Sequence, residues 1–452
     1  MKNILRTMGY ILCGFYVLLT TPGQAAVDSF NSQKLKAPLS QPSYDHFVVY
    51  SKINFTANNR TVELIRVDSK IGVSAAPVVL YTGSTHVPVD IKINKDLAGL
   101  TYITFEEIKG NGIYAIPNFH EVTIPNLSAP NSFIYRTINL PVPTGGTLNV
   151  VGCDQAVNPV TIEQYFVCGV ADPLSGTNAL DIWVGKSPNF TTQPQWQKIT
   201  TVNQSGDLPD GMGIMYDSQK NELLVRFHTN GFFLPAASRS IYEMTLDPLT
   251  LAVKNPPQII SGNHTINTQL LGSGMQYSPS INSMSLPIQK TGIPFTGAAF
   301  RAKISGTWQD LLTVPDAENV QQIGTADSNL APSLFFAAAR LTRGQWAGAD
   351  TLTAYLFSGP PLYQNLQQIP LGQVNTPVSE SYGFVATLQG RYSNTVPIAV
   401  LYEDNRTTGI RQQKILFTTG DLTTGIFSPL KSVYAPSPNN GLILELAVET
   451  IP

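Results

Sequence analysis

The sequence has little charge, few cysteines and no long apolar run in its 452 residues. Charged residues make up only 13% of the chain, and Lys and Arg form no dense basic patch. Such a chain lacks the electrostatic surface that binds a phosphate backbone, so we expect no nucleic-acid partner. No later segment has about 18 uninterrupted apolar residues, and we therefore expect no integral membrane segment.

The first 25 residues have the pattern of a secretory signal peptide. A short basic segment precedes an apolar run from Tyr10 to Leu19, which is too short to span a bilayer, and Ala25 suits cleavage before Ala26. We expect an exported protein, either secreted or periplasmic. Residues 26–44 are polar and rich in Pro and Ser, which predicts an N-terminal arm. Residues 45–452 are then expected to form one folded domain, and we expect a monomer.

Removal of the leader changes the charge and the cysteine count. Of the 28 basic residues two lie in the leader, so 26 remain against 30 acidic residues, a formal charge of −4. Cys13 is also lost, which leaves Cys153 and Cys168 as a pair in an oxidising compartment. We expect a disulfide between them, which adds about 3 kcal/mol in the chain-entropy model. A catalytic cysteine is the competing interpretation, but neither residue has a His-centred motif beside it.

Short alternating segments predict strands throughout the chain. Residues 87–94 alternate apolar and mostly polar side chains, as a half-buried strand does. The 33 prolines and 35 glycines would interrupt long helices repeatedly, whereas short strands between turns tolerate them. Seven strand-turn-strand candidates follow one another along the chain, at residues 47–67, 100–116, 162–184, 222–246, 298–314, 334–357 and 398–417.

One short repeat indicates the architecture. The pattern Trp-Gln-x-(Ile/Leu)-x-Thr-Val starts at Trp196 and again at Trp308, 112 residues further on. Two units of about 56 residues fit a ring of four-stranded blades. We therefore predict an all-β fold, a β-propeller. Six blades are the first choice because the fifth and sixth hairpins are close enough to share a blade, and seven are the alternative. Two β-sandwich domains also fit the strand content, but no linker divides the chain near its middle.

The C-terminal strands resemble the last blade of sialidases. The strings that carry the resemblance run from Ser381 to Leu388, from Ile398 to Glu403 and from Lys414 to Phe417. Sialidases form a six-bladed propeller whose last blade has a tyrosine strand followed by a Leu-Tyr-Glu strand. The resemblance implies that Tyr382 is the catalytic tyrosine and that Glu403 steadies an active-site arginine. It also implies a sialidase-type glycoside hydrolase if the protein is an enzyme.

Other sialidase features are altered in this sequence. The repeat Ser-x-Asp-x-Gly-x-x-Trp has its nearest match from Ser187 to Trp196, which is two residues too long and has Asn189 at the Asp position. The nearest match to the N-terminal Arg-Ile-Pro string lies around Arg136, more than a hundred residues into the chain. A bidentate carboxylate clamp requires guanidinium groups. The candidates on or beside predicted strands are Arg136, Arg226, Arg301 and Arg340.

The chemistry of the site stays open at this stage. A glycosidase with two carboxylates needs them about 5 to 10 Å apart, and the sequence offers Glu163, Glu222, Glu243 and Asp207 without pairing them. Motifs that bind metals or cofactors are missing, so we expect none. Two functions remain. The favoured one is a sialidase-like propeller that acts on or binds glycans, with weak or no hydrolysis. The alternative is a non-catalytic extracellular scaffold whose partner is a cell-surface protein.

Overall fold

Every element that the structure describes is a β-strand, so the all-β prediction is confirmed. In the described residues no helix is long and apolar enough to cross a membrane. The computed structural model describes residues 44–96, 98–109, 118–142, 149–171, 179–203, 212–218, 220–229, 240–261, 267–270, 276–278, 283–291, 297–304, 307–314, 323–327, 334–341, 350–358, 365–374, 380–387, 395–404, 412–421, 424–437 and 441–451.

The described strands form seven antiparallel sheets, named A to G here. Sheet A contains β1 (His46–Asn54), β2 (Asn59–Asp68), β3 (Val73–Ser74), β4 (Val78–Gly83) and β31 (Leu442–Thr450). Sheet B contains β5 (His86–Lys95), β6 (Thr101–Lys109), β7 (Asn118–Ile124) and β8 (Ile134–Ile138). Sheet C contains β9 (Asn149–Val157), β10 (Gln164–Ala171), β11 (Ala179–Ser187) and β12 (Gln195–Asn203).

The second half of the chain continues this pattern. Sheet D contains β13 (Met212–Asp217), β14 (Glu222–Thr229), β15 (Ser240–Leu246) and β16 (Val253–Ser261). Sheet E contains β17 (Asn267–Leu270), β18 (Gln276–Ser278), β19 (Ser283–Thr291), β20 (Gly297–Ile304) and β21 (Thr307–Val314). Sheet F contains β22 (Ile323–Asp327), β23 (Leu334–Leu341), β24 (Asp350–Ser358) and β25 (Asn365–Val374). Sheet G contains β26 (Glu380–Thr387), β27 (Thr395–Asp404), β28 (Gln412–Asp421), β29 (Ile426–Phe427) and β30 (Lys431–Tyr434).

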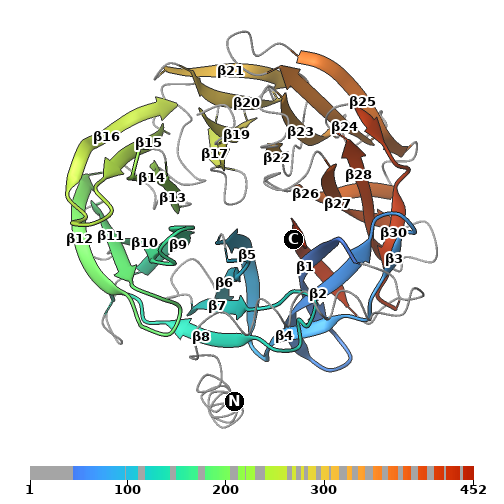
Figure 1. The fold of residues 1–452 in the computed structure, drawn as a ribbon, viewed down its shortest axis with the longest axis horizontal. Coiled ribbons are helices and arrows are strands. Elements are labelled where there is room, and N and C mark those ends of the chain that lie inside the picture. The colour runs from blue at the N-terminus through green and yellow to red at the C-terminus, as the bar shows by residue number, and fades with distance from the viewer. Residues whose placement is uncertain are drawn as a thin grey trace.

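The seven sheets stand around a central axis as the blades of a propeller (Figure 1). In sheets B, C and D the first strand lies nearest the axis and the fourth lies at the rim (Figure 1). Sheet A differs because its strand order is β3-β2-β1-β31, so its innermost strand comes from the other end of the chain. β31 also contacts β5 of sheet B and β26 of sheet G, and the ring is thereby closed.

The first choice of six blades is corrected by this topology, since the described strands divide into seven sheets, the number held as the alternative. Each of the seven predicted hairpins occupies a sheet of its own, so the error was to merge two of them. The interval between the fifth and sixth hairpins is short because the fifth falls on β20 and β21, the last two strands of sheet E, whereas the sixth falls on β23 and β24, the middle strands of sheet F. The ring also differs from the alternative of two sandwich domains.

The Trp-Gln repeat marks equivalent positions in two blades. Trp196 is the second residue of β12, and Trp308 is the second residue of β21. These are the fourth strands of sheets C and E, with sheet D between them. The spacing of two units is therefore confirmed.

Neighbouring sheets are held together by apolar side chains that alternate along each strand. On β1, Val48 and Tyr50 face sheet G, where they pack with Leu401 and Ile415. The alternate residues of β1 pack against sheet B instead, in a core that includes Ile103. Both faces of this strand are buried, and each such side chain contributes about 1.5–3 kcal/mol through loss of water contact. Similar cores lie between sheets B and C, C and D, and F and G.

One turn recurs between the third and fourth strands of sheets A, D and G. Its first residue is an aspartate whose Oδ1 accepts a hydrogen bond from the backbone N–H three residues later, and these residues are Asp68, Asp247 and Asp421. The N–H of the residue four positions after the aspartate donates a hydrogen bond of 2.8 Å to the aspartate carbonyl oxygen in each case. The residue at this position has a positive φ in all three turns, and the residues are Gly72 (66°), Leu251 (58°) and Gly425 (68°). Aspartate favours such turns because its side chain caps the local backbone.

The predicted disulfide is present in sheet C. Cys153 on β9 lies directly opposite Cys168 on β10, their sulfur atoms are bonded, and their Cα atoms are 4.4 Å apart. Both side chains are buried. The bond joins adjacent strands within one blade.

We expect the double variant Cys153→Ala, Cys168→Ala to lose about 2–4 kcal/mol of unfolding free energy, because its unfolded chain is less restricted. Denaturant unfolding with and without reductant measures this. Reduced wild-type protein should match the variant. Peptide mapping of the unreduced protein should find the two cysteines linked, and two free thiols in oxidised material would contradict the structure.

Candidate functional site

The innermost strand of sheet B is distorted at Asp90. The register of β5 against β6 shifts between Val89 and Lys92, which marks a β-bulge. Asp90 has a φ of 54°, a left-handed conformation that is uncommon for a residue other than glycine. Its side chain is exposed. Strained conformations of this kind cost on the order of 1–3 kcal/mol and concentrate at functional sites, so the bulge is a candidate site.

Two buried glutamates lie beside the bulge. Glu445 on β31 accepts hydrogen bonds from the backbone N–H groups of Asp90 and Ile91. Burial raises the pKa of Glu445 to about 8, and the negative charge of Asp90 adds to this effect. Glu106 on β6 accepts a hydrogen bond of 2.5 Å from the N–H of Cys153. Burial raises the pKa of Glu106 to about 8 as well, again with help from Asp90. Both glutamates are therefore largely protonated near neutral pH.

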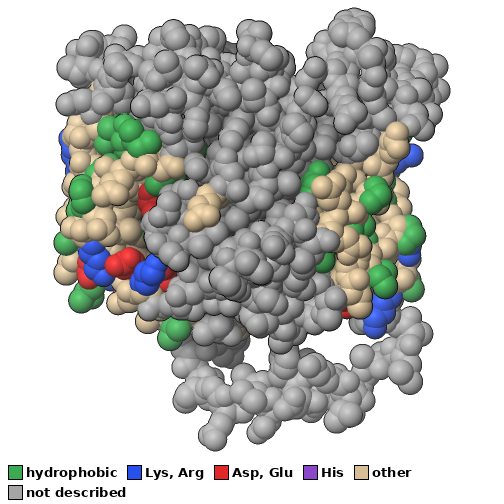
Figure 2. All heavy atoms as spheres, turned by 90° about the horizontal axis from the view of Figure 1, so that it is seen from above, with side chains coloured by type: hydrophobic (Ala, Val, Ile, Leu, Met, Phe, Trp, Pro, Cys, Tyr) green, Lys and Arg blue, Asp and Glu red, His purple; other side chains and the backbone are tan. Residues whose placement is uncertain are grey.

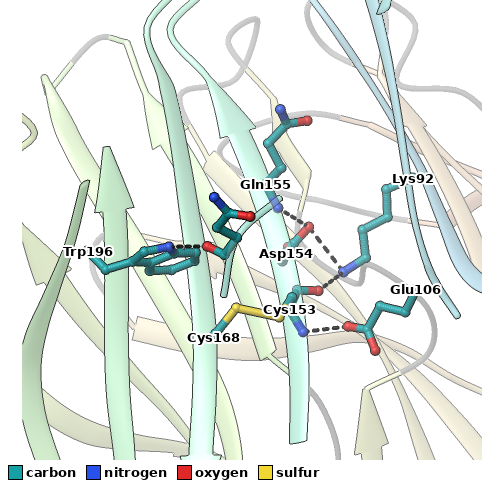
Figure 3. Close-up of a disulfide and its surroundings, with 8 residues drawn as sticks. Lys92, Glu106, Cys153, Asp154, Gln155, Cys168 and Trp196 are labelled. Atoms are coloured by element: carbon teal, nitrogen blue, oxygen red, sulfur yellow. Dashed lines mark hydrogen bonds and ion pairs between the residues drawn. A yellow bond between two sulfur atoms is a disulfide. The ribbon is translucent and has the colours of Figure 1, made fainter. Parts of the chain in front are cut away.

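Lys92 joins this group to sheet C (Figure 3). Its Nζ lies 3.0 Å from Oδ1 of Asp154 and 3.3 Å from the carbonyl oxygen of Cys153. Burial alone would lower the pKa of Lys92, but the carboxylates around it, first Asp154, raise it above its ordinary value. Asp154 also accepts a hydrogen bond of 2.9 Å from the N–H of Ile214 in sheet D. We call Asp90, Lys92, Glu106, Asp154 and Glu445 the axial cluster.

The axial cluster combines an exposed carboxylate with neighbouring carboxyl groups that hold their protons. Environments that separate the protonation of nearby carboxyl groups are the usual basis for acid and base roles. An exposed carboxylate accepts hydrogen bonds from hydroxyl groups, and a protonated one can donate. In the described part of the chain, no group of three or more His, Cys, Asp or Glu side chains could hold a metal ion.

A second polar cluster links sheets A and B. His120 Nε2 lies 3.1 Å from Oε2 of Glu107, which also accepts hydrogen bonds from Asn118 and, at Oε1, from the hydroxyl of Tyr81. Burial raises the pKa of Glu107, but the hydrogen bonds from these three side chains together lower it by more, so the net shift of the pKa is downward. Burial and Glu107 raise the pKa of Tyr81. Tyr81 is thus a hydrogen-bond donor rather than an activated nucleophile, and this cluster is a structural link.

The residues implied by the sialidase resemblance lie partly in the described region. Tyr382 is on β26, directly opposite Tyr402 on β27, and its side chain lies outside the described part. Glu403 is on β27, opposite Ser381. It is half-buried, and its Oε1 accepts a hydrogen bond of 2.8 Å from Gln413. The strands therefore place Tyr382 and Glu403 near the same end of sheet G.

Arg136 and Arg226 have internal partners. Arg136 is on β8 at the rim of sheet B, where its Nε lies 2.8 Å from Oε1 of Glu121 and its side chain also donates to the carbonyl of Thr192. Arg226 is fully buried on β14 and donates twice to Oε2 of Glu243, at 3.0 and 2.9 Å. The partners of the two arginines lie in different blades, so these contacts do not bring them together.

The remaining candidates are dispersed. Arg301 is on β20, opposite Leu286 and Asp310, and the Arg301 side chain lies outside the described part, as does that of Arg340 on β23. Among the candidate carboxylates, Glu163 pairs with Lys186 and Glu222 pairs with Lys254. Glu243 is the partner of Arg226, and Asp207 lies outside the described residues.

No family model and no curated protein matches the chain. Solved structures do. A puromycin hydrolase mutant complexed with PGG has a TM-score of 0.51 and 9% identity, over 88% of this chain and 55% of its own. The sialidase of Trypanosoma rangeli has a TM-score of 0.45 and 11% identity, over 75% of this chain and 55% of its own. Hadza microbial sialidase Hz136 has a TM-score of 0.44 and 9% identity, over 81% of this chain and 74% of its own.

This chain spans about half the length of the first two of these proteins. At such identities the similarity concerns the fold alone, and the match to the puromycin hydrolase agrees with the ring of sheets described above. The chain has a β-propeller fold, as the strand pattern of the sequence predicted.

We predict that Glu445→Gln reduces the loss of stability that the wild type shows as the pH rises from about 4.5 to about 8. Because the pKa of Glu445 in the folded chain is raised above its unfolded value, its stabilising contribution is fully present below about pH 4.5. That contribution is lost as the pH rises through about 8. Thermal unfolding between pH 5 and 9 measures the effect, with Glu163→Gln as the matched control. A wild-type and Glu445→Gln protein with parallel pH profiles would contradict this assignment.

We also predict that Arg226 is structural. Arg226→Ala should cost about 3–5 kcal/mol of unfolding free energy because Glu243 is left buried without its partner. The double variant Arg226→Met, Glu243→Leu should recover most of that loss, since neither charge remains. Denaturant unfolding of the three proteins measures the difference. Equal stability of the wild type and Arg226→Ala would show that the pair does not form.

Proposed function

We propose that this protein is exported and binds glycans at the axial cluster, with weak or no hydrolysis of sialosides. The observation that carries the proposal is Asp90, an exposed carboxylate in a left-handed conformation on the innermost strand of sheet B. Glu445 fixes its backbone from sheet A through two hydrogen bonds. The backbone that carries the carboxylate is thus fixed, which lowers the conformational entropy that binding must otherwise overcome.

The chemistry of the cluster suits sugar hydroxyl groups. Asp90 offers acceptor oxygens for hydroxyl groups. Because Glu106 and Glu445 are protonated, they place no negative charge beside Asp90 that would repel its carboxylate. Specific binding of a neutral polar ligand needs a small number of such fixed groups.

Two contacts argue against efficient sialoside turnover. A sialic-acid carboxylate requires free guanidinium groups, and Arg136 and Arg226 already form ion pairs with Glu121 and Glu243. Releasing either arginine would leave a buried glutamate without the opposite charge beside it, which is strongly unfavourable. Tyr382 and Glu403 would then act without these two arginines as a substrate clamp.

Export is supported by the leader pattern of residues 1–25 and by the disulfide, which is typical of proteins in oxidising compartments. On the wall seen in Figure 2, basic and acidic side chains lie close to each other among apolar ones. This mixed surface agrees with the absence of a basic patch in the sequence.

We expect glycan-array binding by the mature protein that is reduced at least about tenfold, roughly 1.4 kcal/mol, in Asp90→Asn. The substitution keeps the shape and removes the charge. Asp181→Asn, at a surface ion pair on β11, is the matched control and should bind like the wild type. A fluorogenic sialoside should be turned over weakly or not at all by the wild type and by Tyr382→Phe.

Two results would overturn the proposal. Strong sialoside turnover that Tyr382→Phe abolishes would make the protein a sialidase with a site elsewhere. Absence of binding to every glycan, by protein that unfolds cooperatively, would favour the protein-interaction scaffold instead.

A further inference from the structure

The seam between β1 and β31 has a buried histidine at one end. His46 is the first residue of β1, lies directly opposite Thr450 of β31, and is only 2% exposed. Its Nδ1 is 3.2 Å from Oγ1 of Thr450, so a side-chain hydrogen bond joins β1 to β31 in addition to the backbone hydrogen bonds between the two strands. Its ring packs 5.6 Å from that of Phe417 in sheet G. His46 therefore contacts both the closing strand and the neighbouring blade.

Burial makes the protonation of His46 unfavourable, and the charged groups around the ring act in opposite directions. Lys95 from β5 reaches the same place, because its Nζ donates to the carbonyl oxygen of Thr450 and lies 3.9 Å from Oε1 of Glu449. On the other side, Asp45 has an Oδ2 atom 3.5 Å from Nε2 of His46. That carboxylate is already engaged, since Asp45 accepts hydrogen bonds from both the N–H and the hydroxyl of Ser69. A proton on His46 would add a second cation to the region that holds Lys95.

We propose that the β1–β31 seam is an acid-sensitive latch, in which protonation of His46 loosens the pairing of β31 with β1 and opens the ring. Neutral His46 bonds Thr450 and packs on Phe417 at no electrostatic cost. The protonated ring must either remain in a buried site beside Lys95 or reach water by separating the strands. Separation is possible at this seam because β31 is held in sheet A by β1 alone.

The sign of the effect follows from linkage. Burial lowers the pKa of His46 to about 4; Asp45 opposes this shift, and Lys95 adds to it. An open seam exposes the ring and restores its ordinary pKa, so the open state binds a proton between about pH 6.5 and 4. The stabilising contribution of His46 is fully present above this window and is lost as the pH falls through it. Between pH 7 and 5 the linkage corresponds to about a 20-fold rise in seam opening.

Amide hydrogen exchange by mass spectrometry tests the latch in the full mature chain. After correction for intrinsic rates, peptides from residues 46–54 and 442–450 should exchange about 20-fold faster at pH 5 than at pH 7. Peptides from β10 in sheet C should change much less. In His46→Gln, which cannot take up the proton, the acid-induced rise should be largely lost. The matched control His86→Gln, at a half-exposed histidine, should behave like the wild type.

A second variant covers the case in which His46→Gln does not fold. Val48 and Val448 are directly opposite each other in the ladder, so cysteines at both positions can lock the seam. The oxidised double variant should show no acid-induced rise in these peptides, and its reduced form should show it. A full rise in His46→Gln or in the locked ring would overturn the latch. So would equal acceleration of all sheets in the wild type.

Discussion

The fold depends on the pairing of β31 with β1, because this ladder joins strands from opposite ends of the described chain. Every other sheet is built from strands that follow one another in sequence. Seven such sheets in an open row would leave an apolar face uncovered at each end, and closure covers both. Closing so long a loop has an entropic cost that rises only slowly with length. The apolar cores on both faces of β1, which include Val48 and Ile103, offset that cost.

Closure also creates the axial cluster. Carboxyl groups on the inner side of one sheet accept hydrogen bonds from backbone N–H groups of the next sheet. Glu445 accepts from β5, Glu106 from β9 and Asp154 from β13. Each bond satisfies a backbone donor that would otherwise be buried without a partner, a loss of about 1–3 kcal/mol. The same groups therefore align the blades and set the charge around Asp90. The candidate site therefore depends on the integrity of the ring rather than on a separate loop.

Local patterns in the sequence predicted the strands, the hairpins and the disulfide, and the spacing of Trp196 and Trp308 gave the blade unit. Six blades were preferred to seven because the fifth candidate hairpin falls on β20 and β21, the last two strands of sheet E, and so lies close in sequence to the sixth. The axial cluster was missed because Asp90, Glu106 and Glu445 become neighbours only when β31 returns to the axis. The recurring aspartate turns could have marked the end of the third strand in several blades. The repeat is hard to recognise in the sequence because Leu251 occupies the position that is glycine in the other two turns.

The most direct test of the account is calorimetric unfolding of the mature chain ended at residue 441, which removes β31. We expect broad, weakly cooperative unfolding at a much lower temperature, because β1 and the inner side of sheets B and G then lose their cover. Full-length protein should unfold in a sharper transition. A shortened chain with the same sharp transition at the same temperature would show that the β1–β31 pairing does not hold the ring, and would contradict the account.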